Sequence, residues 1–166
     1  MTTVIDVRDL VETPGAFRAV RVEEAIPGLA TQLAQVPEDR RIAAEMLLES
    51  VTDGIVVTGP VSGSMKLSCA RCLKPFDQDF EIQVQELYAA GAEPDGEEYP
   101  LVEGQVDLEP LIRDVVVLAM PFAPLCRPDC RGLCARCGGD LNLGECTCPP
   151  DADPRWAPLA DLELDD

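Results

Sequence analysis

The sequence contains no histidine, and this absence removes several kinds of catalytic and metal site. Without an imidazole there can be no Ser-His-Asp or Cys-His relay, no HExxH zinc protease and no histidine metal ligand. Any transition-metal site must therefore be built from thiolates and carboxylates.

Basic residues are also scarce. The 166 residues include 31 Asp plus Glu but only 13 Lys plus Arg, which gives a formal net charge of -18. A field of that sign repels phosphate, so the composition argues against a general DNA-binding protein and against binding to anionic membranes. A basic protein is the partner that this charge favours.

The chain has no long hydrophobic run. The longest, VVVLAMPFAPL at residues 115–125, is interrupted by proline and is far shorter than the roughly 20 residues of a membrane-spanning helix. The first residues, MTTVIDVRDL, lack the basic and apolar regions of a secretory signal. We therefore expect a soluble cytoplasmic protein, and in that reducing compartment eight cysteines indicate metal binding more often than disulfides.

The length predicts one domain, or one domain with a small appendage. A chain of this size buries roughly 70% of the surface that its unfolded form exposes, so it does not need disulfides in order to fold. We expect three parts: a main domain over residues 1–125, a cysteine-rich zinc-binding segment over 126–148 and an acidic tail over 149–166. The tail is either docked with a solvated acidic face or binds a partner through its apolar residues, which are Trp156, Leu159, Leu162 and Leu164.

Hydrophobic alternation predicts strands in the middle of the chain. Every second residue from Ile55 to Cys69 is apolar or glycine, and a second alternating run extends from Phe76 to Tyr88. The two runs should pair as antiparallel strands. A third run, from Ile42 to Leu48, leads into the turn sequence Thr52-Asp53-Gly54, which is typical of a hairpin. A helix through residues 43–50 is the competing interpretation.

Residues 89–104 carry five acids and no base, and we expect a mobile surface loop there. Asp107 can then cap a helix that ends before Pro121. Its apolar stripe should pack on the sheet, and comprises Leu108, Leu111, Ile112, Val115, Leu118 and Ala119. The predicted class is α+β: an antiparallel β-sheet covered by a helix, with a zinc-ribbon-like appendage.

The cysteines form four close pairs: Cys69/Cys72, Cys126/Cys130, Cys134/Cys137 and Cys146/Cys148. Zinc prefers four tetrahedral thiolates, and a tight turn presents two sulfurs to one ion, so four pairs predict two zinc ions. The pairs can be combined in three ways. Spacing favours a local site from the last two pairs, which only eight residues separate. Cys69/Cys72 would then be completed by Cys126/Cys130.

Other cysteine chemistries are open at this stage. A thioredoxin-type redox pair requires a βαβ context, whereas the flanks of Cys69/Cys72 predict two strands. A disulfide framework requires an oxidising compartment, and an iron-sulfur cluster has compatible ligands. No Ser, Lys or carboxylate lies in a recognisable nucleophile motif, so we expect a protein without catalytic activity.

Basic residues are concentrated at the cysteines: Lys66, Arg71, Lys74, Arg127, Arg131 and Arg136. The windows 66–74 and 126–137 contain a single acid, Asp129, so together they carry +5 and the rest of the chain carries -23. These six residues are candidate RNA contacts. The alternative is charge balance, because a four-thiolate zinc site is itself formally negative.

Several motifs resemble the bacterial YceD family of large ribosomal RNA subunit accumulation proteins. They are LSCARCLKPF, QELY, VDLEPLIRDVVVLAMP and PLCRPDCRGLCARCGGDLN, which occur in that order between about Asp6 and Trp156. The resemblance implies a role in making or maintaining large-subunit ribosomal RNA and a gene that often lies beside the gene for a small, basic, large-subunit ribosomal protein. It also implies that Cys69, Cys72 and the Cys126/Cys130 region form a paired cluster.

Three classes of function follow. The leading hypothesis is a zinc-stabilised, non-catalytic factor in large-subunit biogenesis that binds a basic large-subunit ribosomal protein or a ribosomal RNA precursor. The alternative is a zinc-ribbon-like nucleic-acid or transcription accessory protein. The third is a thiol enzyme. No membrane and no small-molecule substrate is expected as a partner.

Overall fold

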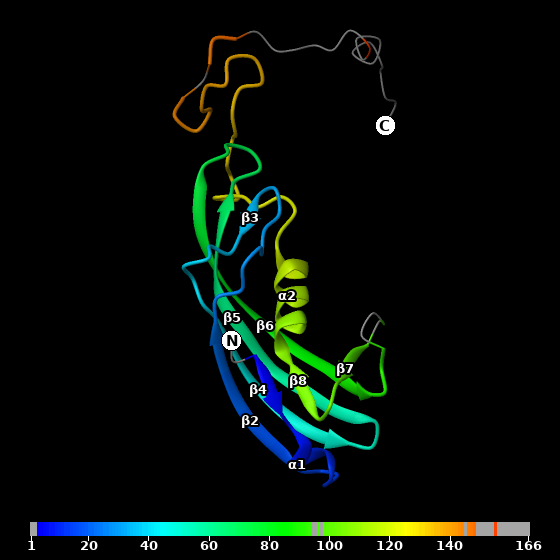
Figure 1. The fold of residues 1–166 in the computed structure, drawn as a ribbon. Coiled ribbons are helices and arrows are strands. Elements are labelled where there is room, and N and C mark those ends of the chain that lie inside the picture. Colours follow the sequence, from blue (N-terminus) through cyan, green and yellow to red (C-terminus); the bar gives the residue numbers. More distant parts are fainter. Residues whose placement is uncertain (1–2, 94–95, 97, 145, 149–154, 156–166) are drawn as a thin grey trace, which may run out of the picture.

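A computed structural model describes residues 3–93, 96, 98–144, 146–148 and 155 and contains the predicted α+β fold, dominated by strands (Figure 1). In chain order the elements are β1 (Val4–Asp6), α1 (Arg8–Val11), β2 (Phe17–Glu24), β3 (Ala34–Gln35), β4 (Ile42–Val51), β5 (Gly54–Ser68), β6 (Pro75–Ala90), β7 (Tyr99–Leu101), β8 (Gln105–Asp107) and α2 (Leu108–Ala119). The elements before β4 carry weaker hydrophobic patterns and were not expected from the sequence.

Six strands form the main sheet, in the order β2-β4-β5-β6-β7, with β3 paired to β5. All pairs in it are antiparallel except that of β6 with the short edge strand β7. Strands β1 and β8 form a separate antiparallel pair. The sheet is therefore antiparallel, as predicted, apart from one parallel edge.

The two predicted hairpins are confirmed. Val51 pairs with Gly54 around the first turn, and Ser68 pairs with Pro75 around the second. The alternative helix over residues 43–50 is wrong, because β4 buries alternate residues such as Met46 and Leu48 and exposes those between them. Figure 1 shows β5 and β6 extending along the molecule to a tip that lies next to the cysteine segment.

Gly59 is required by the close approach of β4 to β5. A Cβ at this position would lie 2.0 Å from the carbonyl oxygen of Glu45, and its φ of +153° is one that other residues rarely adopt. The next residue, Pro60, has no N–H to donate to the ladder. The β4–β5 pairing is accordingly interrupted between Ala44↔Val61 and Leu47↔Thr58.

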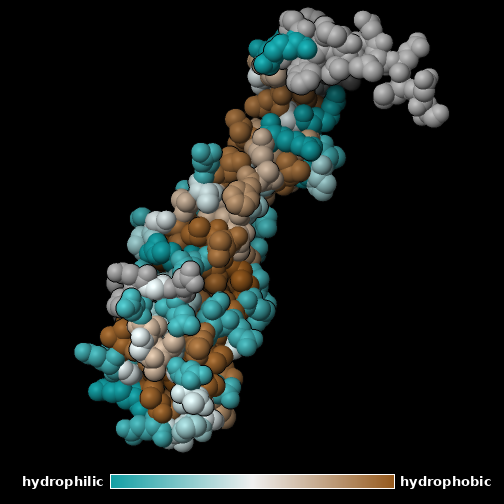
Figure 2. Space-filling view, turned by 90° about the vertical axis from the view of Figure 1, so that its right-hand side faces the viewer, coloured by the Kyte–Doolittle hydropathy of each residue, from teal (hydrophilic) through white to brown (hydrophobic). Residues whose placement is uncertain are grey.

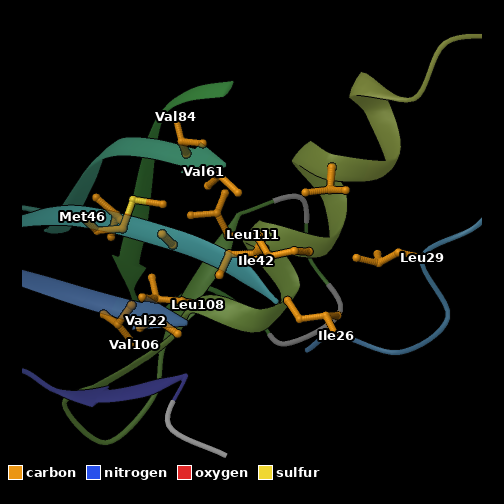
Figure 3. Packing of buried hydrophobic residues seen from close by; sticks show 14 of the residues in the cluster. Val22, Ile26, Leu29, Ile42, Met46, Val61, Val84, Val106, Leu108 and Leu111 are labelled. Carbon is orange, nitrogen blue, oxygen red and sulfur yellow. The ribbon is translucent and has the colours of Figure 1, made fainter. Parts of the chain in front are cut away.

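Helix α2 covers one face of the sheet and closes the core. Its N-cap is Asp107, as predicted, whose side chain accepts a hydrogen bond from the backbone N–H of Glu109 at 3.0 Å. The side chains of Leu108 and Leu111 lie among sheet residues that include Val22 and Ile42 (Figure 3). The buried positions of this helix are Leu108, Leu111, Ile112 and Val116.

The end of the predicted stripe does not enter the core. Leu118 is 83% exposed, and Ala119 is exposed as well. Val116 and Met120 on either side of it are buried in the core, so Leu118 lies on a face of the last turn that points away from the core, and the following Phe122 is 99% exposed. Hydrophobic residues are visible along much of this side of the elongated molecule (Figure 2).

The acidic segment 89–104 is more ordered than expected. Strand β7 lies inside it, and Val102 pairs with Gln105 just before β8. The ring of Tyr99 stacks on that of Tyr88, which gives β7 an aromatic contact to the sheet. The loop prediction is wrong for this part because a tertiary contact outweighs the acidic composition.

The tail prediction for residues 149–166, with its four apolar residues, lies outside the described residues except for Arg155. Among the helices of the described ranges, none has the length and apolar character needed to cross a membrane.

Candidate metal centres

Two sets of four thiols converge at one end of the molecule. The first, here called the inner cluster, consists of Cys69, Cys72, Cys126 and Cys130. The second, the outer cluster, consists of Cys134, Cys137, Cys146 and Cys148. Within each cluster the sulfurs lie within 4.8 Å of one another. The structure thus groups the pairs in the combination that their spacing favoured.

The inner cluster joins two distant parts of the chain. The β5–β6 turn provides Cys69 and Cys72, and the segment after α2 provides the other two sulfurs. The Sγ atoms of Cys69 and Cys130 are 3.8 Å apart, and those of Cys72 and Cys126 are 3.7 Å apart. A tetrahedral zinc ion with Zn–S bonds of about 2.3 Å separates its sulfurs by about 3.8 Å. The inner cluster therefore has the dimensions of a tetrathiolate zinc site.

Backbone hydrogen bonds hold the inner turn in shape. The N–H of Cys69 donates to the carbonyl of Lys74 at 3.0 Å, and that of Leu73 donates to the carbonyl of Cys69 at 2.9 Å. The N–H of Ala70 donates to the carbonyl of Pro124 at 2.7 Å, which ties the hairpin tip to the segment after α2. These bonds fix the two cysteine turns relative to each other.

The inner turn also favours a thiolate at Cys69. Burial opposes ionisation of this sulfur, but the N–H groups of Cys126, Cys72 and Arg71 point towards it and lower its pKa to about 6. Its surroundings are dry: Cys69, Cys72 and Cys130 are buried against Phe76, Leu125 and Leu133.

The outer cluster is local and more open. The N–H of Cys134 donates to the carbonyl of Gly139 at 2.8 Å, and the N–H of Gly138 donates to the carbonyl of Cys134 at 2.9 Å. Gly138 has a φ of +69°, which a tight turn around two sulfurs requires. Cys137 is exposed and the other three cysteines are half-buried. Water reaches this cluster more readily than the inner one.

The thiols of both clusters have perturbed pKa values. The N–H groups of Cys137 and Arg136 lower the pKa of Cys134 to about 6. Loss of water and the neighbouring thiols raise the pKa of Cys126 to about 12, and a hydrogen bond with Cys137 raises that of Cys148 to about 12. Four adjacent thiolates repel one another unless a cation lies between them. The donor set and its charge therefore fit a divalent metal ion with soft ligands.

Asn142 and Asp140 lie in the loop between the two cysteine pairs of the outer cluster and contact the inner cluster and the hairpin tip, and the sequence reasoning missed both. The side-chain N–H₂ of Asn142 donates to Cys130 Sγ at 3.6 Å and to the Asp140 carboxylate at 2.7 Å. Asp140 forms an ion pair with Lys74 at 2.5 Å, which reaches back to the hairpin tip. The only sequence signal was their position in the polar stretch GGDLN between two cysteine pairs.

The candidate RNA contacts lie at this end of the molecule, and several have partners within the chain. Arg71 donates to the carbonyl of Cys130 at 2.8 Å, and Arg127 donates to the side-chain oxygen of Asn142 at 2.7 Å. That oxygen also accepts the backbone N–H of Arg131 at 2.8 Å. Lys66 is exposed on β5, and Arg136 is exposed between two cysteines of the outer cluster. Arg71, Lys74 and Arg127 thus hold the cysteine segments in place.

A mostly β fold with one long helix and two cysteine tetrads defines an α+β protein with two sites that could hold metal ions. The chain belongs to the YceD family, described as "Large ribosomal RNA subunit accumulation protein YceD", whose profile matches residues 57–163. The matched region contains all eight cysteines, and the family resemblance seen in the sequence is confirmed.

Individual relatives agree with this assignment. An uncharacterized protein of Mycobacterium tuberculosis is 33% identical over 165 residues, which cover 95% of this chain and 80% of the relative. Another of Mycobacterium leprae is 34% identical over 170 residues, or 96% and 76% of the two chains. A maize protein named "Large ribosomal RNA subunit accumulation protein YCED homolog 1, chloroplastic" is 38% identical over 53 residues, 31% of this chain and 18% of its own. No solved structure matches the chain.

Proposed function

We propose that the protein is a non-catalytic cytoplasmic factor in large ribosomal subunit biogenesis. The family's description as a large ribosomal RNA subunit accumulation protein carries this proposal. The charge of the chain favours binding of a basic protein, because outside the two cysteine windows it carries -23. The first partner is a basic large-subunit ribosomal protein, and contact with a large-subunit RNA precursor is secondary.

In this proposal the two clusters each hold a zinc ion. Sulfur separations of 3.7 and 3.8 Å in the inner cluster support that choice, as does a donor set without histidine. The eight cysteines would be the ligands. Each zinc ion would cross-link the cysteine segments and would not take part in a reaction. The same proposal keeps the division into a main domain over 1–125, a zinc-binding segment over 126–148 and a tail over 149–166.

The absence of catalysis is part of the proposal. Cys69 has a lowered pKa, but it lies in a β-hairpin turn and is buried, whereas a redox thiol must reach its substrate. Thiol-disulfide exchange is therefore the activity to assay. Reduction of insulin at a rate comparable to a thioredoxin would contradict the non-catalytic role.

The test of partnership is affinity capture of the full-length protein from cytoplasm, with and without nuclease. Capture of a basic large-subunit ribosomal protein that survives nuclease treatment supports the proposal. An association that nuclease abolishes would make RNA the primary partner. Binding to transcription complexes without ribosomal precursors would favour the zinc-ribbon-like accessory role, which the +5 windows support.

A further inference from the structure

A cavity of about 530 Å³ is lined by residues of β7, β8 and the first turns of α2. These elements lie away from the cysteine segment (Figure 1). Tyr99 lines the cavity with a half-buried ring, and the buried Tyr88 is stacked against that ring. Apolar side chains complete much of the rest: Val4, Pro100, Val102 and Pro110.

Hydrogen bonds hold both tyrosines in place. Their ring centroids are 5.2 Å apart with an interplanar angle of 25°. The buried Tyr88 donates its hydroxyl to the carbonyl of Asp107 at 2.7 Å. The half-buried Tyr99 donates to Asp114 Oδ2 at 2.8 Å. The aromatic wall is therefore preorganised, and a ligand need not order it.

The charge of the lining has one sign. Glu98, Asp107 and Asp114 contribute carboxylates, and no Lys or Arg is among the described residues that line the cavity. Burial raises the pKa of Tyr99 above its usual value, and Asp114 and Glu86 raise it further because they oppose a second negative charge. The electrostatic potential beside the ring is negative.

An aromatic wall with carboxylates around it suits a flat organic cation. A guanidinium group stacks on an aromatic face and offers five N–H donors to several carboxylates at once. An ammonium group is a compact, strongly hydrated charge and would use the ring wall less well. The apolar side chains can cover the methylene groups of an arginine.

We propose that this cavity binds an arginine side chain presented by a segment of a basic protein. The inference rests on the proposed function, because it names the place on this chain where a basic ribosomal protein would be anchored. Buried aromatic and arginine contacts commonly dominate protein interfaces. Asp114, held by Tyr99, would accept the guanidinium, and Glu98 would complete the clamp.

The test uses the full-length, metal-containing protein and a defined probe, the peptide acetyl-Gly-Arg-Gly-Arg-Gly-amide. Its counterpart carries citrulline, which has nearly the same shape as arginine without the charge. We expect the arginine peptide to shift the backbone amide resonances of residues 99–102 and 105–114. We expect the citrulline peptide to bind at least about tenfold more weakly, since it loses the charge-assisted bonds.

Matched double variants separate the cavity from the general acidic field. Glu98→Gln with Asp114→Asn should weaken peptide binding about tenfold, whereas Asp79→Asn with Glu81→Gln removes the same charge from exposed positions on β6 and should change it less than about twofold. If thermal unfolding shows that the Asp114 change disturbs the fold, Glu98→Gln alone provides the comparison.

Several results would overturn the inference. Equal weakening by the two double variants would mean that the peptide senses only the overall charge. Equally tight binding of free N-acetylarginine amide would indicate a small-molecule site. A cavity variant that retains full affinity for a captured ribosomal protein would refute the cavity alone, whereas failure of the wild-type chain to associate with ribosomal precursors would refute the proposed function.

Discussion

The two cysteine clusters differ in how deeply their sulfurs are buried and in what they connect. Cys69 lies in the β5–β6 turn, and its cluster joins this turn to the segment after α2, with two close sulfur pairs that are 54 and 61 residues apart in the chain. Cys134 belongs to a local, half-buried loop. Loss of a metal from each cluster should therefore have different structural consequences.

We expect Cys134→Ser to release one metal equivalent and leave the sheet folded, whereas Cys69→Ser should also lower the stability of the main domain. Zinc contributes about 10 to 16 kcal/mol of apparent binding energy in small structural sites, so the second loss should be large. Metal analysis and thermal unfolding of both variants measure the difference. Equal melting temperatures would show that the inner cluster does not support the sheet.

Asn142 should support both clusters without binding metal itself. Its amide contacts Cys130 Sγ, Asp140 and Arg127, and removal of such outer partners typically lowers metal affinity about 10 to 100-fold. We expect Asn142→Ala to lower the metal affinity by about 10 to 100-fold, as measured by competition with a chelator. Leu143→Ala, at an 84% exposed neighbour, is the control and should retain it. Identical chelator curves would contradict the bridging role.

At the scale of elements, the predicted apolar stripe of α2 is only partly buried. Leu111 is fully buried on the sheet, whereas Leu118 is 83% exposed. We expect Leu111→Ala to lower the free energy of unfolding by about 2 to 5 kcal/mol, because it removes packing and leaves a cavity. Leu118→Ala should change it by less than about 0.5 kcal/mol. Chemical denaturation measures both, and a large effect at Leu118 would show that its face is covered in solution.

For the whole molecule, the two cysteine tetrads predict two zinc equivalents per chain. Elemental analysis of protein purified without added metal should return a value close to two. A value close to one equivalent would contradict the outer site. Iron together with its characteristic absorbance would indicate an iron-sulfur cluster instead of zinc. A metal-free chain that remains fully folded would contradict the structural role of both sites.

The basic residues near the metals provide a second test at this scale. Replacement of Arg71, Lys74, Arg127 and Arg131 by Ala should reduce metal retention, because the side chains of the first three make contacts within the cysteine segments. RNA association should be absent or unchanged. Lys66→Ala, which removes one exposed charge from β5, is the control for charge alone.

A phosphate-binding role would give a different result. RNA association would then weaken in the fourfold variant, and its dependence on salt would flatten by roughly one unit of slope per lost phosphate contact. That outcome would favour direct RNA contact over charge balance at the metal end of the molecule.

The sequence by itself determined the local features of this protein. Alternation from Ile42 to Tyr88 predicted the central strands because successive residues in a strand point to opposite faces. Asp107 marked the start of α2 because its carboxylate can accept a free N–H of the first turn. The eight residues between the last two cysteine pairs predicted the outer tetrad, because a short loop costs little entropy to close, and the remaining two pairs then formed the inner tetrad.

The tertiary structure decided the features that depend on what lies opposite a residue. Leu118 continues the apolar stripe of α2, yet it is exposed, whereas Val116 and Met120 on either side of it enter the core. Tyr99 lies in an acidic segment, yet stacking on Tyr88 makes it part of a strand. Asn142 bonds a sulfur twelve residues away, and the aromatic cavity combines β7, β8 and α2. Such contacts arise only when distant elements meet, so no local pattern records them.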